Sequence, residues 1–302
     1  MIEFRSLSKR FGDKPAVDDL SFKALPGRVT GFLGPNGSGK TTTMRILLGL
    51  ETADSGEALV GGEPYRRIKN PLFRVGALLD ARNAHPGRTG FDHLKALALT
   101  HGISNDRVEF VLEEVGLSGV ASRRVGGYSL GMRQRLGIAA SMLGDPDVFV
   151  FDEPVNGLDP DGVMWFRELV RDFAAEGRTV LLSSHLISEV ALTADHVVIV
   201  GRGKVLADSP LSDIARLQGA ERVMVRSPRA RDLIEPLVAS GAKVAEERDV
   251  LTVEGSTAED VGLLAARLNI PLTELRTQVE SLEETYRQLT DSSVEYRQGS
   301  ER

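Results

Sequence analysis

The segment Val29–Leu50 reads VTGFLGPNGSGKTTTMRILLGL. It begins with a short apolar run, passes through a glycine-rich turn, and continues with the apolar spacing of a helix. The turn contains the pattern Gly-x-x-x-x-Gly-Lys-Thr, from Gly34 to Thr41. Between a strand and a helix, this pattern is specific for a phosphate-binding loop. The segment therefore predicts an α/β domain that binds a nucleotide.

The residues of this loop are suited to holding a triphosphate. Glycines let successive backbone N–H groups surround the β-phosphate, and the start of the following helix adds its positive end. Lys40 supplies a positive charge to the β- and γ-phosphates, which makes it a catalytic candidate, and the Thr41 hydroxyl is suited to ligating Mg²⁺. The predicted contacts with the nucleotide are Gly34, Pro35, Asn36, Gly37, Ser38, Gly39, Lys40, Thr41 and Thr42.

Two carboxylates follow a second apolar run, in the segment DVFVFDEPVNGLDP. A strand that ends at Asp152 beside a phosphate loop can present this carboxylate to Mg²⁺. Because neighbouring strand residues point to opposite sides, Glu153 can face a different direction. We assign Glu153 as the general base that activates the attacking water, a role typically worth about 10²–10⁴ in rate.

A histidine follows another apolar run, in TVLLSSHL. A lone histidine after a buried strand is commonly a structural residue. In open α/β sheets, however, ligands gather at the carboxyl ends of the strands. His185 is therefore also a catalytic candidate, and the γ-phosphate is its expected contact.

Composition narrows the class of protein. The 302 residues, 41% of them hydrophobic, are enough for one large domain and a smaller one. The formal net charge of −6 argues against a dedicated nucleic-acid binder, so no nucleic-acid partner is expected. The absence of cysteine excludes disulfides and thiol chemistry and fits a reducing compartment. No apolar run approaches the ~20 residues of a membrane-spanning helix, and the N-terminus lacks a signal-peptide core, so we expect a soluble cytoplasmic protein.

Apolar runs alternate with helical patterns from Ile2 to about Leu217, which is typical of an α/β domain with a largely parallel sheet. From about residue 91 to residue 124, helical periodicity appears with no strand between the helices. We expect one domain at residues 1–217, with a helical subdomain at about 85–140. Its clearest strands are Val29–Leu33, Val148–Phe151, Val180–Ser183 and Val197–Val200.

The pattern changes after Gln218. ERVMVRS, RARDLIEPLVASG, AKVAEERDVLTVEG, TAEDVGLLAARLNI and PLTELRTQ follow one another in the order β-α-β-β-α-β. This is the order of a ferredoxin-like unit, so we expect residues 218–302 to form a small α+β accessory domain. A last predicted helix, VESLEETYRQL, places Leu282, Tyr286 and Leu289 on one face, which packs either on its own domain or on a partner.

Taken together, these motifs resemble those of the nucleotide-binding subunits of ABC (ATP-binding cassette) transporters, and the resemblance runs from Ile2 to the end of the chain. GPNGSGKTT is similar to the Walker A motif and VFVFDEP to Walker B. YSLGM occupies the place of the LSGGQ signature, NGLD that of the D-loop, and SSHL that of the switch-histidine loop. The resemblance implies a P-loop NTPase fold of ABC type with a helical signature subdomain, and ATP and Mg²⁺ as cofactors.

The resemblance also implies a partner of the same kind. In this family two subunits pair head to tail, and the signature loop of one completes the phosphate site of the other. This assigns Ser129, Gly131 and Met132 to the nucleotide of the partner, and it places Asp159 near the dimer seam. Phe11, in SKRFG, occupies the place of an aromatic that stacks on adenine, with a role in the core as the alternative. We therefore expect a homodimer that closes on ATP.

Some positions depart from the family pattern. Leu130 stands where the signature has its second glycine, and Met132 stands where it has its final glutamine, a change that recurs in export-type members. In GALLDARNAHPGRTG, Asp80 stands where the Q-loop has a glutamine. Because a carboxylate can approach Mg²⁺ or its bound water, Asp80 is assigned to the metal site together with Thr41 and Asp152.

The stretch GALLDARNAHPGRTG and the tail SLEETYRQLT are similar to ATPase subunits of the drug-export group that includes daunorubicin- and bacitracin-resistance systems. The membrane-spanning subunits of that group are separate proteins. The expected function is to power efflux of a drug, lipid or other amphiphile, through a separate integral-membrane permease, at the cytoplasmic face of the membrane. One alternative is a soluble ABC ATPase that acts on the ribosome or on DNA. Another is a non-catalytic, ATP-gated regulator, which the presence of Glu153 and His185 opposes.

Overall fold

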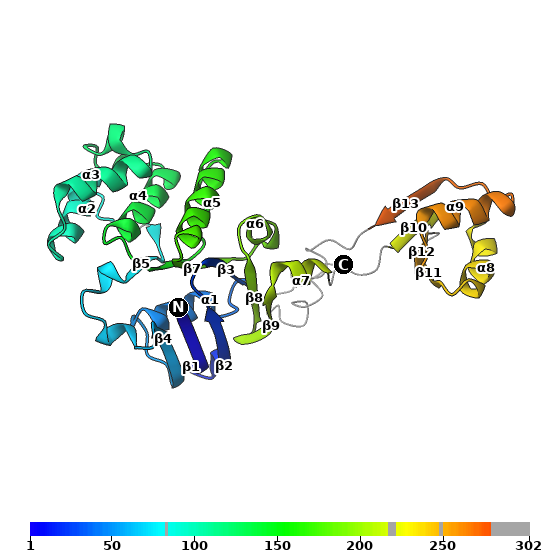
Figure 1. Cartoon of the computed structure of the whole chain (residues 1–302), viewed down its shortest axis with the longest axis horizontal. Helices are drawn as coiled ribbons and strands as arrows, with labels where there is room; N and C mark the ends of the chain where they lie inside the picture. Colours follow the sequence, from blue (N-terminus) through cyan, green and yellow to red (C-terminus); the bar gives the residue numbers. More distant parts are fainter. Residues whose placement is uncertain (82–83, 217–221, 248–249, 279–302) are drawn as a thin grey trace. The chain divides into compact units, whose positions relative to one another are not determined.

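The computed structural model describes residues 1–302 except 82–83, 217–221, 248–249 and 279–302. It contains two compact units, the first including Met1–Leu211 and the second beginning at Ser212 (Figure 1). The domain boundary expected between residues 217 and 218 lies outside the described residues and stays a prediction. The expected last helix, with its face of Leu282, Tyr286 and Leu289, also lies outside them.

A six-stranded sheet forms the centre of the first unit, in the order β5-β6-β7-β3-β8-β9. Every neighbouring pair from β5 to β8 is parallel, and β9 runs antiparallel to β8. The four strands expected from apolar runs are thereby confirmed as β3, β6, β7 and β8. The bounds are β3 Arg28–Leu33, β5 Val75–Leu78, β6 Val148–Phe151, β7 Thr179–Ser184, β8 His196–Gly201 and β9 Lys204–Pro210.

A second sheet, in the order β2-β1-β4, is antiparallel throughout. Its strands are β1 Ile2–Phe11, β2 Lys14–Ala24 and β4 Ser55–Val60. The ring of Phe22 lies 4.6 Å from that of Phe4 and 5.0 Å from that of Phe32 in β3, measured between centroids. These rings join the two sheets in one apolar core.

Helices cover both faces of the central sheet (Figure 1). α5 (Pro160–Ala175) and α6 (Ile187–Ala191) pack on β3 and β7. α1 (Lys40–Leu47) contributes Met44 and Leu47 to the core between the sheets. Because α1 begins where β3 and its loop end, the start of this helix lies at the carboxyl edge of the parallel sheet.

The predicted helical insertion is confirmed. It consists of α2 (Gly90–Leu99), α3 (Asn105–Glu114) and α4 (Leu130–Met142), and two 3₁₀ turns, at Ser118–Val120 and Val125–Gly127, lie between α3 and α4. The side chains of Thr89, Ser104 and Ser129 cap α2, α3 and α4 respectively. Further 3₁₀ turns span Tyr65–Arg67 and Pro71–Phe73, before β5.

The elements of the C-terminal unit follow the order that the sequence predicts. α7 (Leu211–Arg216) precedes them. The sheet order is β11-β12-β10-β13, and every neighbouring pair is antiparallel, as in a split β-α-β unit. Residues of α8, α9, β10 and β12 share one apolar core. The bounds are β10 Arg222–Arg226, a 3₁₀ turn at Ala230–Leu233, α8 Ile234–Ala239, β11 Lys243–Glu247, β12 Val250–Glu254, α9 Ala258–Arg267 and β13 Glu274–Gln278.

Candidate functional site

The predicted phosphate loop connects β3 to α1, as the motif requires. Gly39 has a φ of 102°, in the left-handed region that favours glycine. A Cβ atom on Gly39 would collide with the carbonyl oxygen of Ala16, so only glycine fits this close approach. The Ser38 hydroxyl is buried and finds no hydrogen-bond partner among the described residues. A buried hydroxyl of this kind inside a loop of N–H donors fits an incoming phosphate oxygen.

Lys40 is the first residue of α1, and its side chain turns back over the loop. Its Nζ donates to the carbonyl oxygens of Gly34 at 2.6 Å and Pro35 at 3.3 Å. Burial lowers the pKa of Lys40, although the carboxylates of Glu153 and Asp152 act in the opposite direction. These hydrogen bonds hold the ammonium group of Lys40 beside the phosphate loop, where it can bind the negative charge of a phosphate.

Asp152 directly follows the strand β6 and contacts hydroxyls from two directions. Its Oδ2 accepts from the Thr41 hydroxyl at 2.6 Å, which joins the phosphate loop to β6. Its Oδ1 accepts a hydrogen bond from Ser183 at the end of β7. Thr42 follows Thr41 in α1 and is half-buried. The structure thus brings together Thr41 and Asp152, two of the three residues that the sequence analysis assigned to Mg²⁺.

Glu153 and His185 also meet at this edge of the sheet. The Nδ1 atom of His185 lies 2.8 Å from the Oε2 atom of Glu153. The other carboxylate oxygen, Oε1, lies 3.7 Å from the Nζ of Lys40. The three candidates for catalysis therefore form one connected cluster at the ends of β3, β6 and β7. His185 has a structural partner in Glu153, and its contact with a γ-phosphate stays a prediction.

The polar residues at this edge fit a magnesium ion that arrives with a nucleotide. Among the described residues, no group of three or more His, Cys, Asp or Glu side chains could hold a metal ion by itself. Mg²⁺ in nucleotide sites is commonly bound by one or two protein oxygens together with phosphates and waters. The adjacent oxygens of Thr41 and Asp152 supply such a pair.

A cleft of about 620 Å³ opens beside this cluster. Asp80 follows the strand β5 and lies on the wall of the cleft, as the assignment to the metal site requires. Its coordination of Mg²⁺ stays a prediction. The lining residues that bear on the site are Thr41, Asp80, Leu130, Gln134, Asp152, Glu153 and Asn156.

Phe11 lies near the middle of the phosphate loop, away from the Thr41–Asp152 contact. Its side chain is 53% exposed, so the alternative of a core role is wrong. With Asn36 and Gly37 of the loop, it lines a hollow of about 540 Å³. Arg202, which the sequence analysis did not select, lines the same hollow. Stacking of Phe11 on adenine stays a prediction that this location supports.

The signature turn precedes α4. The hydroxyl of Ser129 accepts from the backbone N–H of Met132 at 3.2 Å and so caps the helix. The side chain of Leu130 packs against Gly157, where a Cβ would collide with it. A Cβ on Gly131 would lie 2.8 Å from the Gly157 carbonyl oxygen, so glycine is needed there. The large residue at position 130 is therefore accommodated by a glycine in the turn after β6.

Asp159 belongs to the same turn and caps the next helix. Its Oδ1 accepts from the backbone N–H of Gly162 at 2.9 Å, in the first turn of α5. This is a structural role in which the capping carboxylate favours the start of the helix. The predicted place of Asp159 near a dimer seam concerns a second chain and stays a prediction.

Two residues of the site were missed by the sequence analysis. The Ser183 hydroxyl accepts from the Glu153 N–H at 2.9 Å in addition to its bond with Asp152. Gln134 of α4 is 5% exposed, and its Nε2 donates to the carbonyl oxygen of Pro154 at 2.7 Å. A signal for Ser183 was present, since a serine at the carboxyl end of an apolar strand needs a polar partner. Gln134 gave no such signal, because its partners are backbone atoms of a distant turn.

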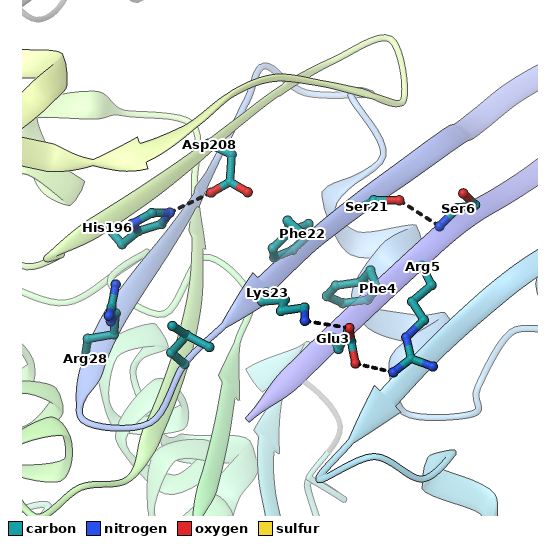
Figure 2. A pocket seen from close by; sticks show the side chains of 11 residues that line it. Glu3, Phe4, Arg5, Ser6, Ser21, Phe22, Lys23, Arg28, His196 and Asp208 are labelled. Atoms are coloured by element: carbon teal, nitrogen blue, oxygen red, sulfur yellow. Dashed lines mark hydrogen bonds and ion pairs between the residues drawn. The ribbon is translucent and has the colours of Figure 1, made fainter.

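Another hollow, of about 540 Å³, lies between the strand pairs β1–β2 and β8–β9 (Figure 2). Five of the side chains that line it form ion pairs with one another. Arg5 and Lys23 contact the Glu3 carboxylate at 2.6 and 2.9 Å, which lowers the pKa of Glu3 to about 2. His196 pairs with Asp208 at 2.6 Å. Because β3 and β8 begin here, the hollow lies at the edge of the sheet opposite the phosphate loop, and no predicted site residue lines it.

Comparison with known proteins agrees with the fold. Residues 17–156 match the family model of the ABC transporter, and residues 221–283 match a model described as a domain of unknown function. The bacitracin transport ATP-binding protein BcrA of Bacillus licheniformis is 38% identical over 219 residues, which are 72% of each chain. The lantibiotic transport ATP-binding protein SrtF of Streptococcus pyogenes is 34% identical, over 69% of this chain and 90% of that protein.

A solved ATP-binding subunit of an ABC transporter superposes with a TM-score of 0.64 at 26% identity, over 72% of this chain and 92% of that one. The chain therefore belongs to the family of ABC transporter ATP-binding proteins. It is an ATP-binding subunit of a transporter, and the reaction of this family is ATP hydrolysis. No helix in the described part of the chain is both long and apolar enough to cross a membrane.

Proposed function

We propose that this chain is the ATPase subunit of an exporter for an amphiphilic molecule, such as a peptide antibiotic, and that it works as a homodimer on a separate permease. Relatives named for transport of bacitracin and lantibiotics support this choice of cargo. The observation that carries the proposal is the connected cluster of Lys40, Glu153 and His185 beside the phosphate loop. This cluster supplies the groups that hydrolysis of a terminal phosphate requires.

Each residue of the cluster has a distinct proposed role. Lys40 binds the β- and γ-phosphates, while the 2.8 Å contact with His185 orients the Glu153 carboxylate toward an attacking water. Thr41 and Asp152 hold Mg²⁺, with Asp80 next to it on the cleft wall. When bound, the ion neutralises part of the charge on the phosphate oxygens.

The second half of each pocket is proposed to come from the partner protomer. Ser129, Gly131 and Met132 lie at the start of α4, where the Ser129 hydroxyl and the positive end of the helix can bind an anion. Two chains facing head to tail place this turn over the partner's phosphate loop, and Asp159 then lies at the seam. Bound ATP holds the two protomers together in a closed dimer, and hydrolysis of ATP lets the dimer open. We place the protein at the cytoplasmic face of the membrane, bound to its permease.

Co-isolation tests the link to a permease. We expect an affinity-tagged chain to recover a multi-spanning membrane protein encoded beside it when detergent-solubilised membranes are passed over the tag. The recovered complex should hydrolyse ATP in the presence of Mg²⁺. A matched sample that lacks the neighbouring gene should leave the chain outside the membrane fraction. ATPase activity that instead requires ribosomes or DNA would contradict the exporter and support the soluble alternative.

A further inference from the structure

The backbone of Glu153 is held in an uncommon conformation. Its φ is 48°, in the left-handed region that residues other than glycine seldom occupy. Such a conformation persists only where the surrounding structure fixes it. The groups that fix the turn at Glu153 therefore also determine where its carboxylate points.

The turn is fixed from two sides. On the side of β7, the Ser183 hydroxyl accepts from the Glu153 N–H at 2.9 Å. On the side of α4, the Gln134 side-chain amide donates to the Pro154 carbonyl at 2.7 Å and approaches the Glu153 carbonyl at 3.5 Å. Gln134 is buried, so its amide is withdrawn from water and depends on these two carbonyls for hydrogen bonds.

These contacts act on the placement of the carboxylate. The Glu153 side chain reaches His185 at 2.8 Å and Lys40 at 3.7 Å only while its backbone keeps this orientation. A displacement of about 1 Å in a catalytic group can reduce a rate by about 10². Gln134 touches neither the phosphate loop nor His185 in these contacts, so it acts through the Glu153 backbone.

We propose that Gln134 is a positioning residue for ATP hydrolysis, which holds the turn at Glu153–Pro154 from the helix that begins at the signature turn. The proposal rests on the proposed role of Glu153 as general base. Gln134 lies on α4, the helix that Ser129 caps. Its contact with the Pro154 carbonyl therefore connects the signature turn with the general base Glu153 within one protomer.

The variant Q134E tests this proposal with little change in volume. It removes both N–H donors and places a carboxylate opposite two carbonyl oxygens. We expect kcat to fall by about tenfold to a hundredfold, while KM for ATP stays within about twofold. Burial beside carbonyls raises the pKa of the introduced carboxyl group, which can donate once protonated. The activity of Q134E relative to the parent should therefore increase as the pH is lowered.

Two further variants control for a merely structural effect. Ser141 is also a buried polar residue of α4, and its hydroxyl donates to the Ile138 carbonyl at 2.6 Å. S141A should keep the parental kcat. If thermal unfolding shows that Q134E does not fold, Q134L removes the same donors without adding a charge, and the same split between kcat and KM is expected.

A double-mutant cycle separates this proposal from the role of Glu153. In an E153Q background, adding Q134E should lower kcat by less than about twofold, because the base on which Gln134 acts is already lost. An equal loss in both backgrounds, or a parental kcat for Q134E alone, would overturn the positioning role and leave the general base standing. A parental rate for E153Q alone would overturn both assignments.

Discussion

Replacing Glu153 with glutamine is expected to lower the rate of ATP hydrolysis by about a hundredfold or more, while ATP binding is retained. Glutamine has nearly the same size and can still contact His185, which lies 2.8 Å from the native carboxylate. It cannot accept a proton from water, so the attacking water loses its base. The substitution also removes a negative charge 3.7 Å from Lys40, which favours bound phosphate.

Phosphate release and size-exclusion chromatography with ATP measure the two effects of E153Q. The variant should turn over slowly and should elute as a dimer that persists in ATP, since hydrolysis no longer releases the partner. Glu176 offers a matched control, because it is an exposed glutamate that pairs with Arg178 at 2.7 Å, outside the cluster. E176Q should behave as the parent does. A parental rate for E153Q would show that the base has been wrongly assigned.

Replacing Lys40 with alanine is expected to raise the Kd for ATP by about a hundredfold or more, to the point where binding is lost or nearly so. The ammonium group is the positive charge that the loop holds for the phosphates. It also donates to the carbonyl oxygens of Gly34 and Pro35, so its removal leaves two loop acceptors without this donor. Both effects lower the affinity of the loop for a triphosphate.

Calorimetric titration with ATP checks this expectation for K40A. Circular dichroism of the same sample establishes that the chain is folded. Lys204 provides the control, since it is an exposed lysine paired with Asp18 at 3.2 Å, and K204A should bind ATP as the parent does. An unchanged affinity for K40A would overturn the interpretation of the glycine-rich segment as the phosphate loop.

The sequence was informative where a function depends on contiguous residues. The strand, loop and helix of Val29–Leu50 form one local unit, so its motif was enough to predict the fold at this edge of the sheet. Asp152, Glu153 and His185 could be placed near it, because each follows a buried strand and parallel strands end at the same edge. The order of elements in the C-terminal unit followed from alternating hydrophobic patterns in the same way.

Contacts between distant segments could not be predicted from such patterns. Gln134 lies 20 positions before Pro154, and the carbonyl it binds exists at every residue, so no side-chain type marks the pair. The turn at Gly157, which accommodates Leu130, is likewise known only from the packing of α4. The separate antiparallel sheet of β1, β2 and β4 was also missed, because β1 pairs with β4, a strand that comes after β3 and α1 in the sequence.

The central claim is that each nucleotide is held by the phosphate loop of one protomer and the signature turn of its partner. Mixing two defective chains tests it most directly. K40A disables the phosphate loop and keeps the turn. S129D keeps a residue that can cap α4, but it places a negative charge where the partner's phosphates would bind.

Neither chain alone should hydrolyse ATP appreciably. In an equal mixture, random pairing makes about half of the dimers mixed, and each mixed dimer has one pocket in which both halves are intact. We therefore predict that mixing restores ATPase activity, to about a quarter of the parental sites at most. If mixing restores no activity although the mixed dimers form, each pocket is completed within a single chain, and the composite site is contradicted.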